Sequence, residues 1–138
     1  FKLFNDTYGH AAGDGALRIV ASTIQKAVRE SDLVVRYGGE EFVAVFPGMN
    51  AAGAVERMEA IRRAVSETPV PLARTQQLAS LTISAGVSTY GVDSLEVDEL
   101  LDAAANRLFQ AKEAGRNRVV GGTGAVSSEW WAVSGRPV

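Results

Sequence analysis

The amino-acid sequence predicts a single mixed α/β domain in which helices flank a β-sheet. Three segments, around residues 13–29, 50–67 and 98–114, carry apolar residues at helical spacing. Residues 81–88 instead alternate between apolar and small or polar residues, which is the two-residue period of a strand. Two β-prone runs flank a Gly-Gly pair at positions 38 and 39, which is typical of a hairpin.

Composition narrows the class of protein further. The chain has 138 residues, enough for one domain with a buried core, and its 46% hydrophobic and 22% charged residues are near globular averages. It has no cysteine, which excludes disulfides, thiolate metal sites and thiol nucleophiles. No apolar run approaches the roughly 20 residues that span a membrane, so we expect a cytoplasmic domain, with membrane attachment left open for the parent protein. The net charge of −2 argues against nucleic acid as a partner.

The first part of the chain is expected to be a turn followed by a helix. Residues 5–10 are rich in side chains that bond their own backbone, which predicts the turn. The helix of residues 13–29 has Asp14 near its start, where a carboxylate caps free N–H groups. Arg29 and Asp32 then belong to a helix end and a solvated turn that lead into the hairpin.

The hairpin turn places Gly38 and Gly39 next to the carboxylates of Glu40 and Glu41. A two-residue turn needs positive φ at both central positions, which glycine adopts without steric cost. Glycines also let a backbone come close to a phosphate, and Mg²⁺ binds oxygen ligands that it often shares with substrate phosphates. The pattern therefore fits either an ordinary hairpin with solvated glutamates or a metal and phosphate site.

The rest of the chain is expected to supply two helices and two strands. Asn50 is the expected N-cap of the helix that ends near residue 67, and the charges of this helix are most simply a solvated face. Gly115 is the expected left-handed C-cap of the last helix, where Lys112 and Arg116 are four residues apart and can lie close together. Residues 118–120 form a short strand, and residues 123–138 are expected to be a flexible tail.

The hairpin Gly38-Gly39-Glu40-Glu41-Phe42 resembles the signature of the GGDEF family, the diguanylate cyclases, in its GGEEF form. Other segments match this family in the same order: Phe1-Lys2, Asn5-Asp6, Gly9-His10, Gly13-Asp14, Arg29-x-x-Asp32, residues 81–87, Ala111-Lys112 and Gly115-Arg116-Asn117. The resemblance covers roughly residues 1–122. It implies a nucleotidyl-cyclase or palm-like fold, an α+β sandwich whose central, largely antiparallel sheet is flanked by helices.

In the family, a central strand with an Asp-x-Asp motif precedes Phe-Lys and its first Asp binds metal. This sequence does not contain that strand, so we expect the sheet to lack its first central strand.

The resemblance implies that two GTP molecules are condensed into cyclic di-GMP, with release of two pyrophosphates, by a homodimer that holds one GTP in each domain. It makes Glu40 a ligand of Mg²⁺ or Mn²⁺, and Glu41 an assistant to the metal or to the attacking hydroxyl. The substrate-binding residues that it implies are Asn5 and Asp14 for guanine, Gly38 and Gly39 for close backbone approach, and Phe1, Lys2, Lys112 and Arg116 for the phosphates.

Arg29-x-x-Asp32 resembles the family's inhibitory site for cyclic di-GMP, in which Arg binds phosphate or a guanine edge and Asp accepts from guanine. Some members support this site with an arginine in the next helix, where this chain has Ala60, so we expect weaker inhibition. In the last helix, Ala105 replaces an Asp and Arg107 adds a charge, which we expect to weaken support for the GTP site.

The alternatives are a non-catalytic receptor for cyclic di-GMP or GTP, and a plain dimerisation module. We expect the parent chain to carry a sensory or receiver domain as well.

Overall fold

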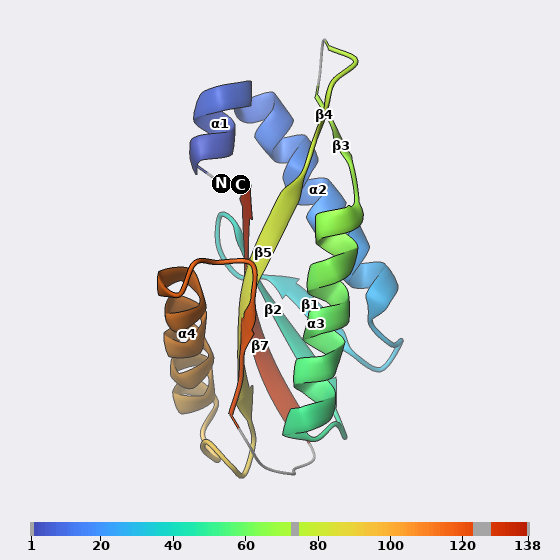
Figure 1. Ribbon diagram of the computed structural model, residues 1–138. Coiled ribbons are helices and arrows are strands. Elements are labelled where there is room, and N and C mark those ends of the chain that lie inside the picture. The colour runs from blue at the N-terminus through green and yellow to red at the C-terminus, as the bar shows by residue number, and fades with distance from the viewer. Residues whose placement is uncertain (1, 73–74, 123–127, 138) are drawn as a thin grey trace.

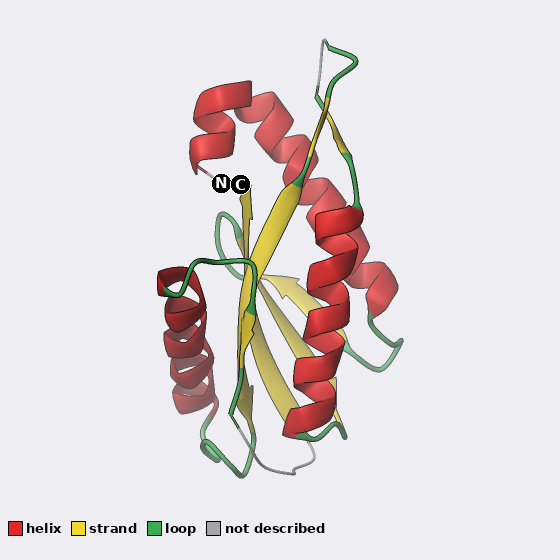
Figure 2. Cartoon of the chain, viewed as in Figure 1, coloured by secondary structure: helices red, strands yellow, loops and turns green. Residues whose placement is uncertain are grey.

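A computed structural model of the protein describes residues 2–72, 75–122 and 128–137. The chain forms a five-stranded sheet with helices on both faces (Figures 1 and 2). In order across the sheet, the strands are β1 (Leu33–Arg36), β2 (Glu41–Pro47), β7 (Ser128–Pro137), β5 (Leu81–Thr89) and β6 (Val119–Val120). Every neighbouring pair is antiparallel except β5 and β6, which are parallel. The fold class predicted from the sequence, an α/β sandwich around a largely antiparallel sheet, is confirmed.

The centre of the sheet differs from the expectation. The sequence predicted a sheet without its first central strand and a flexible tail at residues 123–138. In the structure β7 fills the central position, pairing with β2 from Glu41↔Ser134 onward and with β5 from Leu81↔Pro137 onward. Residues 123–127 lie outside the described residues. Pairing on both sides satisfies the backbone of β7, and such tertiary pairing outweighs the low strand propensity of a Gly- and Ser-containing segment.

The N-terminal region is helical where the sequence predicted a turn. Helix α1 (Lys2–Tyr8) leads into α2 (His10–Ala27) through Gly9, whose φ of 90° breaks the helix. Phe4 of α1 is 1% exposed, and its ring lies 4.9 Å from that of Tyr8. This burial explains why residues with turn propensity are helical here.

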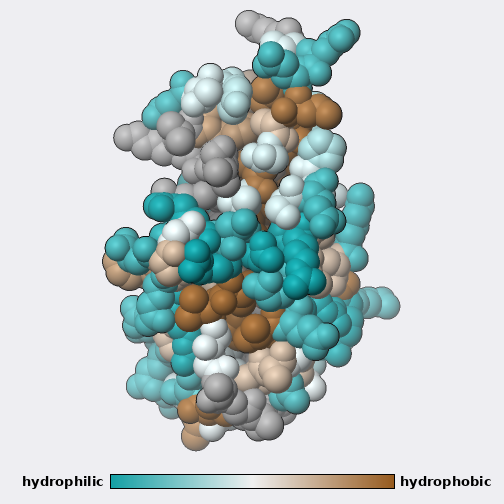
Figure 3. All heavy atoms as spheres, viewed as in Figure 1, coloured by the Kyte–Doolittle hydropathy of each residue, from teal (hydrophilic) through white to brown (hydrophobic). Residues whose placement is uncertain are grey.

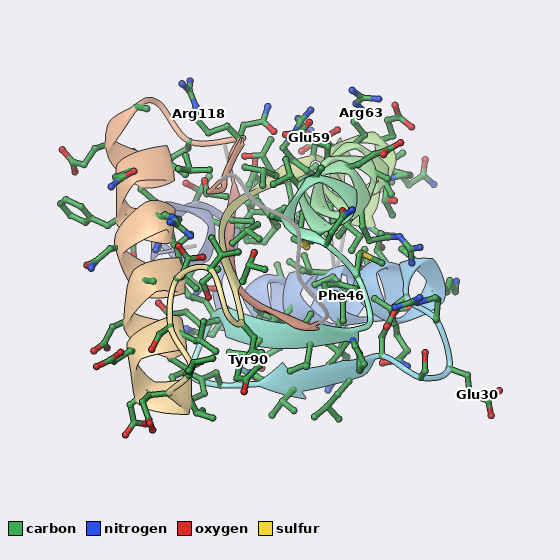
Figure 4. The ribbon with its side chains drawn as sticks, turned by 90° about the horizontal axis from the view of Figure 1, so that it is seen from below. Glu30, Phe46, Glu59, Arg63, Tyr90 and Arg118 are labelled. Atoms are coloured by element: carbon green, nitrogen blue, oxygen red, sulfur yellow. The ribbon has the colours of Figure 1, made fainter. Side chains whose placement is uncertain are left out.

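Helix α3 (Ala51–Glu67) joins α2 on one face of the sheet. The predicted N-cap is confirmed, because Asn50 Oδ1 accepts a hydrogen bond of 2.7 Å from the Gly53 N–H. The core between these helices and the sheet contains Phe46 of β2, which is 0% exposed and lies between the strand and the helices (Figure 4). Two short strands, β3 (Val70–Pro71) and β4 (Leu78–Ala79), pair in a separate sheet beyond α3.

Helix α4 (Val97–Glu113) covers part of the opposite face and lies against β5. The sequence predicted one apolar face for this strand, but all of its residues are buried, because helices cover it on both sides. Gly86 makes the contact possible: a Cβ there would lie 2.0 Å from the backbone oxygen of Ala104. The C-cap of α4 is Ala114, one residue before the predicted Gly115, and Gly115 has the positive φ, 116°.

Hydrophilic side chains cover much of α3 and α4, with hydrophobic residues gathered between the two helices (Figure 3). None of the described helices has the length and apolar character needed to cross a membrane.

Candidate functional site

The hairpin that links β1 and β2 has a longer turn than the sequence predicted. Strand pairing ends at Arg36↔Phe42, and the N–H of Tyr37 then donates to the oxygen of Glu41 at 2.8 Å. Neither Gly38 nor Gly39 has a positive φ, so the prediction of a two-residue turn with positive φ at both is wrong. A loop of residues 37–40 spreads the reversal of the chain over more positions, so the left-handed conformation is not needed.

The two hairpin glycines are not required by packing within the chain. A Cβ at either Gly38 or Gly39 would meet no atom of the described residues within 4 Å. Arg36 holds this loop in place, donating to the carbonyl of Gly38 at 3.3 Å and also to that of Gly39. Bare backbone on an open surface is suited to close approach by a ligand or a partner.

Glu41 lines a cavity of about 300 Å³ between the hairpin and α4. Lys112 and Asp102 of the helix line the same cavity, together with apolar side chains of both elements. Glu40 and Glu41 are both half-buried. The structure therefore brings together Glu41 and Lys112, two of the residues that the resemblance singled out, from positions far apart in the sequence.

The hairpin carboxylates suit a hard divalent cation but supply few ligands. Mg²⁺ is usually held by one or two carboxylates together with substrate phosphates and water. Glu40 and Glu41 match this type of donor. Among the described residues no three Asp, Glu, His or Cys side chains form a group that could hold a metal ion. The residues present thus fit a metal that enters with a phosphate ligand rather than a closed protein cage.

Asp14 lines a second cavity, of about 470 Å³, between α2 and the hairpin. The predicted capping role for Asp14 is wrong, because α2 begins at His10 and its N-cap, Gly9, makes no side-chain cap bond. Arg18 and Arg36 line the cavity with it. The carboxylate is exposed there and lies in the second turn of the helix.

Asn5 is not among the residues that line this second cavity. Its Oδ1 is buried and, within the described part of the chain, has no hydrogen-bond partner. Such an acceptor is costly to leave unpaired, so it is a candidate for contact with a donor from a ligand.

The remaining predicted phosphate ligands are only partly brought together. Arg116 has a φ of 64°, and its backbone N–H donates to the oxygen of Ala111 at 2.9 Å, which fixes the turn after α4. Its exposed side chain does not line the cavity that contains Lys112. Lys2 begins α1, and its side chain lies outside the described part, as does Phe1 altogether.

Arg29 and Asp32 form a compact pair between α2 and β1. The guanidinium of Arg29 donates to the Asp32 carboxylate through Nη2 at 3.0 Å and through Nε at 3.2 Å. The backbone N–H of Arg29 adds a bond of 2.7 Å to the same carboxylate. Asp32 has a side-chain exposure of 0% against 43% for Arg29. The Asp32 carboxylate thus accepts hydrogen bonds from Arg29 of the same chain. The resemblance had implied that it accepts hydrogen bonds from guanine.

Arg57 of α3 is a member of this cluster that sequence reasoning missed. Its Nη1 lies 3.9 Å from Asp32 Oδ2 and donates to the oxygen of Ala27 at 3.3 Å. Its charge was interpreted as part of a solvated face. Helical spacing contained a usable signal, because Arg57 is three residues before Ala60 and so lies on the same side of α3.

Arg107, which we expect to weaken support for the GTP site, is held by β5 and the loop that follows it. It donates to both oxygens of Asp93, at 2.7 and 2.9 Å, and to the carbonyl of Val87. The hydrogen bond from Arg107 holds the pKa of Asp93 below its ordinary value. Burial acts in the opposite direction and raises this pKa, while the hydrogen bond from the N–H of Thr89 lowers it further. Asp93 in turn raises the pKa of Arg107.

Comparison with known proteins places these features in a family. Residues 1–118 match the family described as diguanylate cyclase, GGDEF domain. The Response regulator PleD of Caulobacter vibrioides is 43% identical over 121 residues, which are 88% of this chain and 27% of that protein. Diguanylate cyclase A of Treponema denticola is 40% identical over 119 residues, which are 86% of this chain and 32% of that protein. The chain therefore spans less than a third of the length of these two relatives.

Solved structures agree with the sequence comparisons. The GGDEF domain of DgcB from Caulobacter crescentus, in complex with c-di-GMP, superposes with a TM-score of 0.79 at 34% sequence identity. The match covers 87% of this chain and 70% of that one. The motif, the fold and both comparisons give one answer: the chain belongs to the GGDEF family of diguanylate cyclase domains.

Proposed function

We propose that this domain, paired with a second copy, condenses two GTP molecules into cyclic di-GMP and releases two pyrophosphates. Each copy holds one GTP, and the 3′-hydroxyl of one nucleotide attacks the α-phosphorus of the other. Because GTP is a cytoplasmic metabolite, we place the reaction in the cytoplasm. A sensory or receiver domain in the parent chain would bring the two copies together.

One observation supports this proposal above the others. The hairpin has two glycines that the fold does not need, followed by Glu40 and then by Glu41, which shares a cavity with Lys112. A site for a phosphate and a cation needs bare backbone, a carboxylate and an ammonium group at one place. An ordinary hairpin needs none of them.

The proposed roles follow from the chemistry of each group. Lys112 offsets negative charge on the phosphates, and Asp14 accepts hydrogen bonds from the N1–H and 2-amino groups of guanine, which adenine cannot supply in the same pattern. Glu40 and Glu41 would hold Mg²⁺ or Mn²⁺, which when bound polarises the phosphate and makes the attacking hydroxyl more nucleophilic. The open backbone at Gly38 and Gly39 allows the nucleotide to lie against the turn.

The test is a product assay at high protein concentration with GTP and Mg²⁺, on this chain and on the parent protein. We expect Glu41→Ala to abolish cyclic di-GMP formation in the parent protein, since it removes a metal-binding carboxylate. Glu67→Ala, an exposed carboxylate at the end of α3, is the matched control and should leave turnover unchanged. Undiminished product from Glu41→Ala would contradict the assignment.

A second function is supported by a different observation. The Arg29–Asp32–Arg57 cluster is fully formed, while the described residues offer only a partial set of metal ligands. A receptor that binds cyclic di-GMP without catalysis needs only the cluster. Binding that survives Glu41→Ala but disappears with Arg29→Ala, in a chain that makes no product, would favour this function.

A further inference from the structure

We propose that Arg62 of α3 is a positioning residue for the phosphates of GTP, because it fixes, through Asn117, the turn that carries Arg116. The inference rests on the proposed role of Arg116 as a phosphate ligand, and it adds to that role a side chain from another helix. Arg62 itself does not touch the nucleotide in this arrangement.

The turn after α4 has a backbone conformation that costs free energy. Gly115, Arg116 and Asn117 have φ values of 116°, 64° and 49°, so three consecutive residues have positive φ. Glycine adopts such values without strain and asparagine does so more readily than most residues, but arginine rarely does. A strained turn of this kind persists only where the surrounding structure holds it.

Asn117 is held in this turn from two directions. Its backbone N–H donates to Oγ of Ser84 at 3.2 Å, and Ser84 is a fully buried residue of β5. Its side-chain Oδ1 accepts a hydrogen bond of 2.8 Å from Nη1 of Arg62. The two bonds fix both the backbone and the side chain of Asn117, and with them the point from which the neighbouring Arg116 extends.

Arg62 is oriented for this contact by its own helix. Its Nε and Nη2 donate to one carboxylate oxygen of Glu59, one helical turn earlier in α3, at 3.1 and 2.9 Å. Glu59 thus sets the plane of the guanidinium and leaves Nη1 to bind Asn117. Figure 4 shows Glu59 and Arg118, the residue after the turn, on the same side of the molecule. Lysine and glutamine lack the planar fork of donors that holds both partners at once.

The side chain of Arg116 is available to an anion. It is exposed, and within residues 2–72, 75–122 and 128–137 its guanidinium has no hydrogen-bond partner. Binding a phosphate from a loose turn would order the turn as well as the side chain, whereas a turn that is already fixed avoids this part of the cost. Arg62 therefore raises the affinity of the site for a phosphate without contacting it.

The experiment compares the binding of GTP and of guanosine to this chain and its variants by NMR titration. Ca²⁺, which also binds oxygen ligands, replaces Mg²⁺ to slow turnover, and chromatography checks that the GTP stays intact. Arg62→Gln should weaken GTP binding roughly tenfold, because a charged binding group is misplaced. It should leave guanosine binding unchanged, because guanosine has no phosphate. Arg63→Ala removes a neighbouring arginine that points away from the body of the protein (Figure 4) and should bind both compounds like the unmodified chain.

Two double variants test whether Arg62 acts through the turn. In chains that carry Arg116→Ala or Asn117→Gly, the further change Arg62→Gln should have no additional effect on GTP binding, because a member of the series of contacts is already missing. Glycine adopts positive φ without strain, so Asn117→Gly removes the acceptor and still allows the turn. If Arg62→Gln does not fold, Asn117→Gly alone should weaken the binding of GTP and not of guanosine.

Three results would overturn the inference: unchanged GTP affinity in Arg62→Gln (or in Asn117→Gly, where that variant replaces it), equal losses for GTP and guanosine, and additive losses in the double variants. If Arg116→Ala weakens GTP binding and Arg62→Gln does not, the phosphate ligand stands and only the role of Arg62 is lost. If Arg116→Ala leaves GTP binding unchanged, the roles of both arginines are lost. Condensation of GTP is tested separately by the product assay, so its failure is told apart from failure of this inference.

Discussion

At the scale of single residues, the packing of the fold requires glycine at position 86 but not at position 38. Gly38 has neither a positive φ nor any atom within 4 Å of the place where a Cβ would lie. Gly86 has two backbone atoms of α4 within 2.4 Å of that place. A methyl group therefore tests function at one position and packing at the other.

We expect Gly38→Ala to fold with unchanged or slightly raised stability, by up to about 1 kcal/mol, because alanine restricts the unfolded chain without strain in the folded one. The same change should lower cyclic di-GMP production in the parent protein at least tenfold, because the methyl group obstructs the nucleotide. Melting temperature and turnover are measured on the same preparation. Full turnover in a folded Gly38→Ala variant would mean that no ligand approaches this backbone.

Gly86→Ala is the counterpart and should behave in the opposite way. Its Cβ would overlap the backbone of α4, which cannot move aside as a flexible side chain can. We expect a loss of roughly 1–3 kcal/mol in the free energy of unfolding or a displaced helix, seen in chemical denaturation. A variant as stable as the unmodified chain would show that α4 does not lie so close to β5.

Contacts between individual charged side chains were the features that the sequence predicted least well. Helical spacing places Arg57 on the same side of α3 as Ala60, but its contact with Asp32 depends on how α3 packs in the fold, which periodicity alone does not give. For the same reason the sequence could not predict that Arg107 pairs with Asp93, which lies in a loop 14 positions earlier. Tertiary ion pairs leave no local pattern, so charges on helices are easily interpreted as solvated.

At the scale of elements, the pair Asp93–Arg107 joins α4 to the end of β5 and to the loop between them. The pKa of Asp93 is lower in the folded protein than its ordinary value of 3.8. The stabilisation is therefore fully present above about pH 4 and is lost as the pH falls through the lower, folded value.

We expect Asp93→Asn to lower the free energy of unfolding by about 1–2 kcal/mol at pH 7, because a charge-assisted pair becomes a neutral one. The difference from the unmodified chain should shrink as the pH is lowered below about 4, where Asp93 itself becomes neutral. Urea denaturation at a series of pH values measures this difference. A difference that stays constant down to pH 2.5 would mean that the charge of Asp93 does not stabilise the fold.

Elements with a strong local period could be predicted well. The apolar stripes predicted α3 and α4 to within a residue or two. Asn50 is the N-cap of α3 as expected, and the C-cap of α4 is Ala114, one residue before the expected Gly115. Helix α1 was missed because turn-forming residues hide a helix that is stabilised by the burial of Phe4. The hairpin was predicted, but its turn type was not, since the loop length depends on where strand pairing stops.

At the scale of the whole molecule, β7 is the strand that connects the two parts of the sheet. Among the described strands it separates β2 from β5, so it joins the hairpin with Glu41 to the rest of the sheet. The sequence could not predict this, because both of its partners lie far away along the chain. The residue of β7 that pairs with Glu41 is Ser134, so the central strand places no carboxylate beside the hairpin.

A chain ending at Gly122 tests the role of β7. Without this strand the facing edges of β2 and β5 lose their partners, and unpaired edges of this kind bind other chains. We expect the shortened chain to lose cooperative thermal unfolding and to aggregate, as measured by circular dichroism and light scattering. As a control, replacing Trp130 and Trp131 by valine retains residues with strand propensity and should preserve the strand. If the shortened chain unfolds cooperatively at the original temperature, β7 is dispensable for the fold.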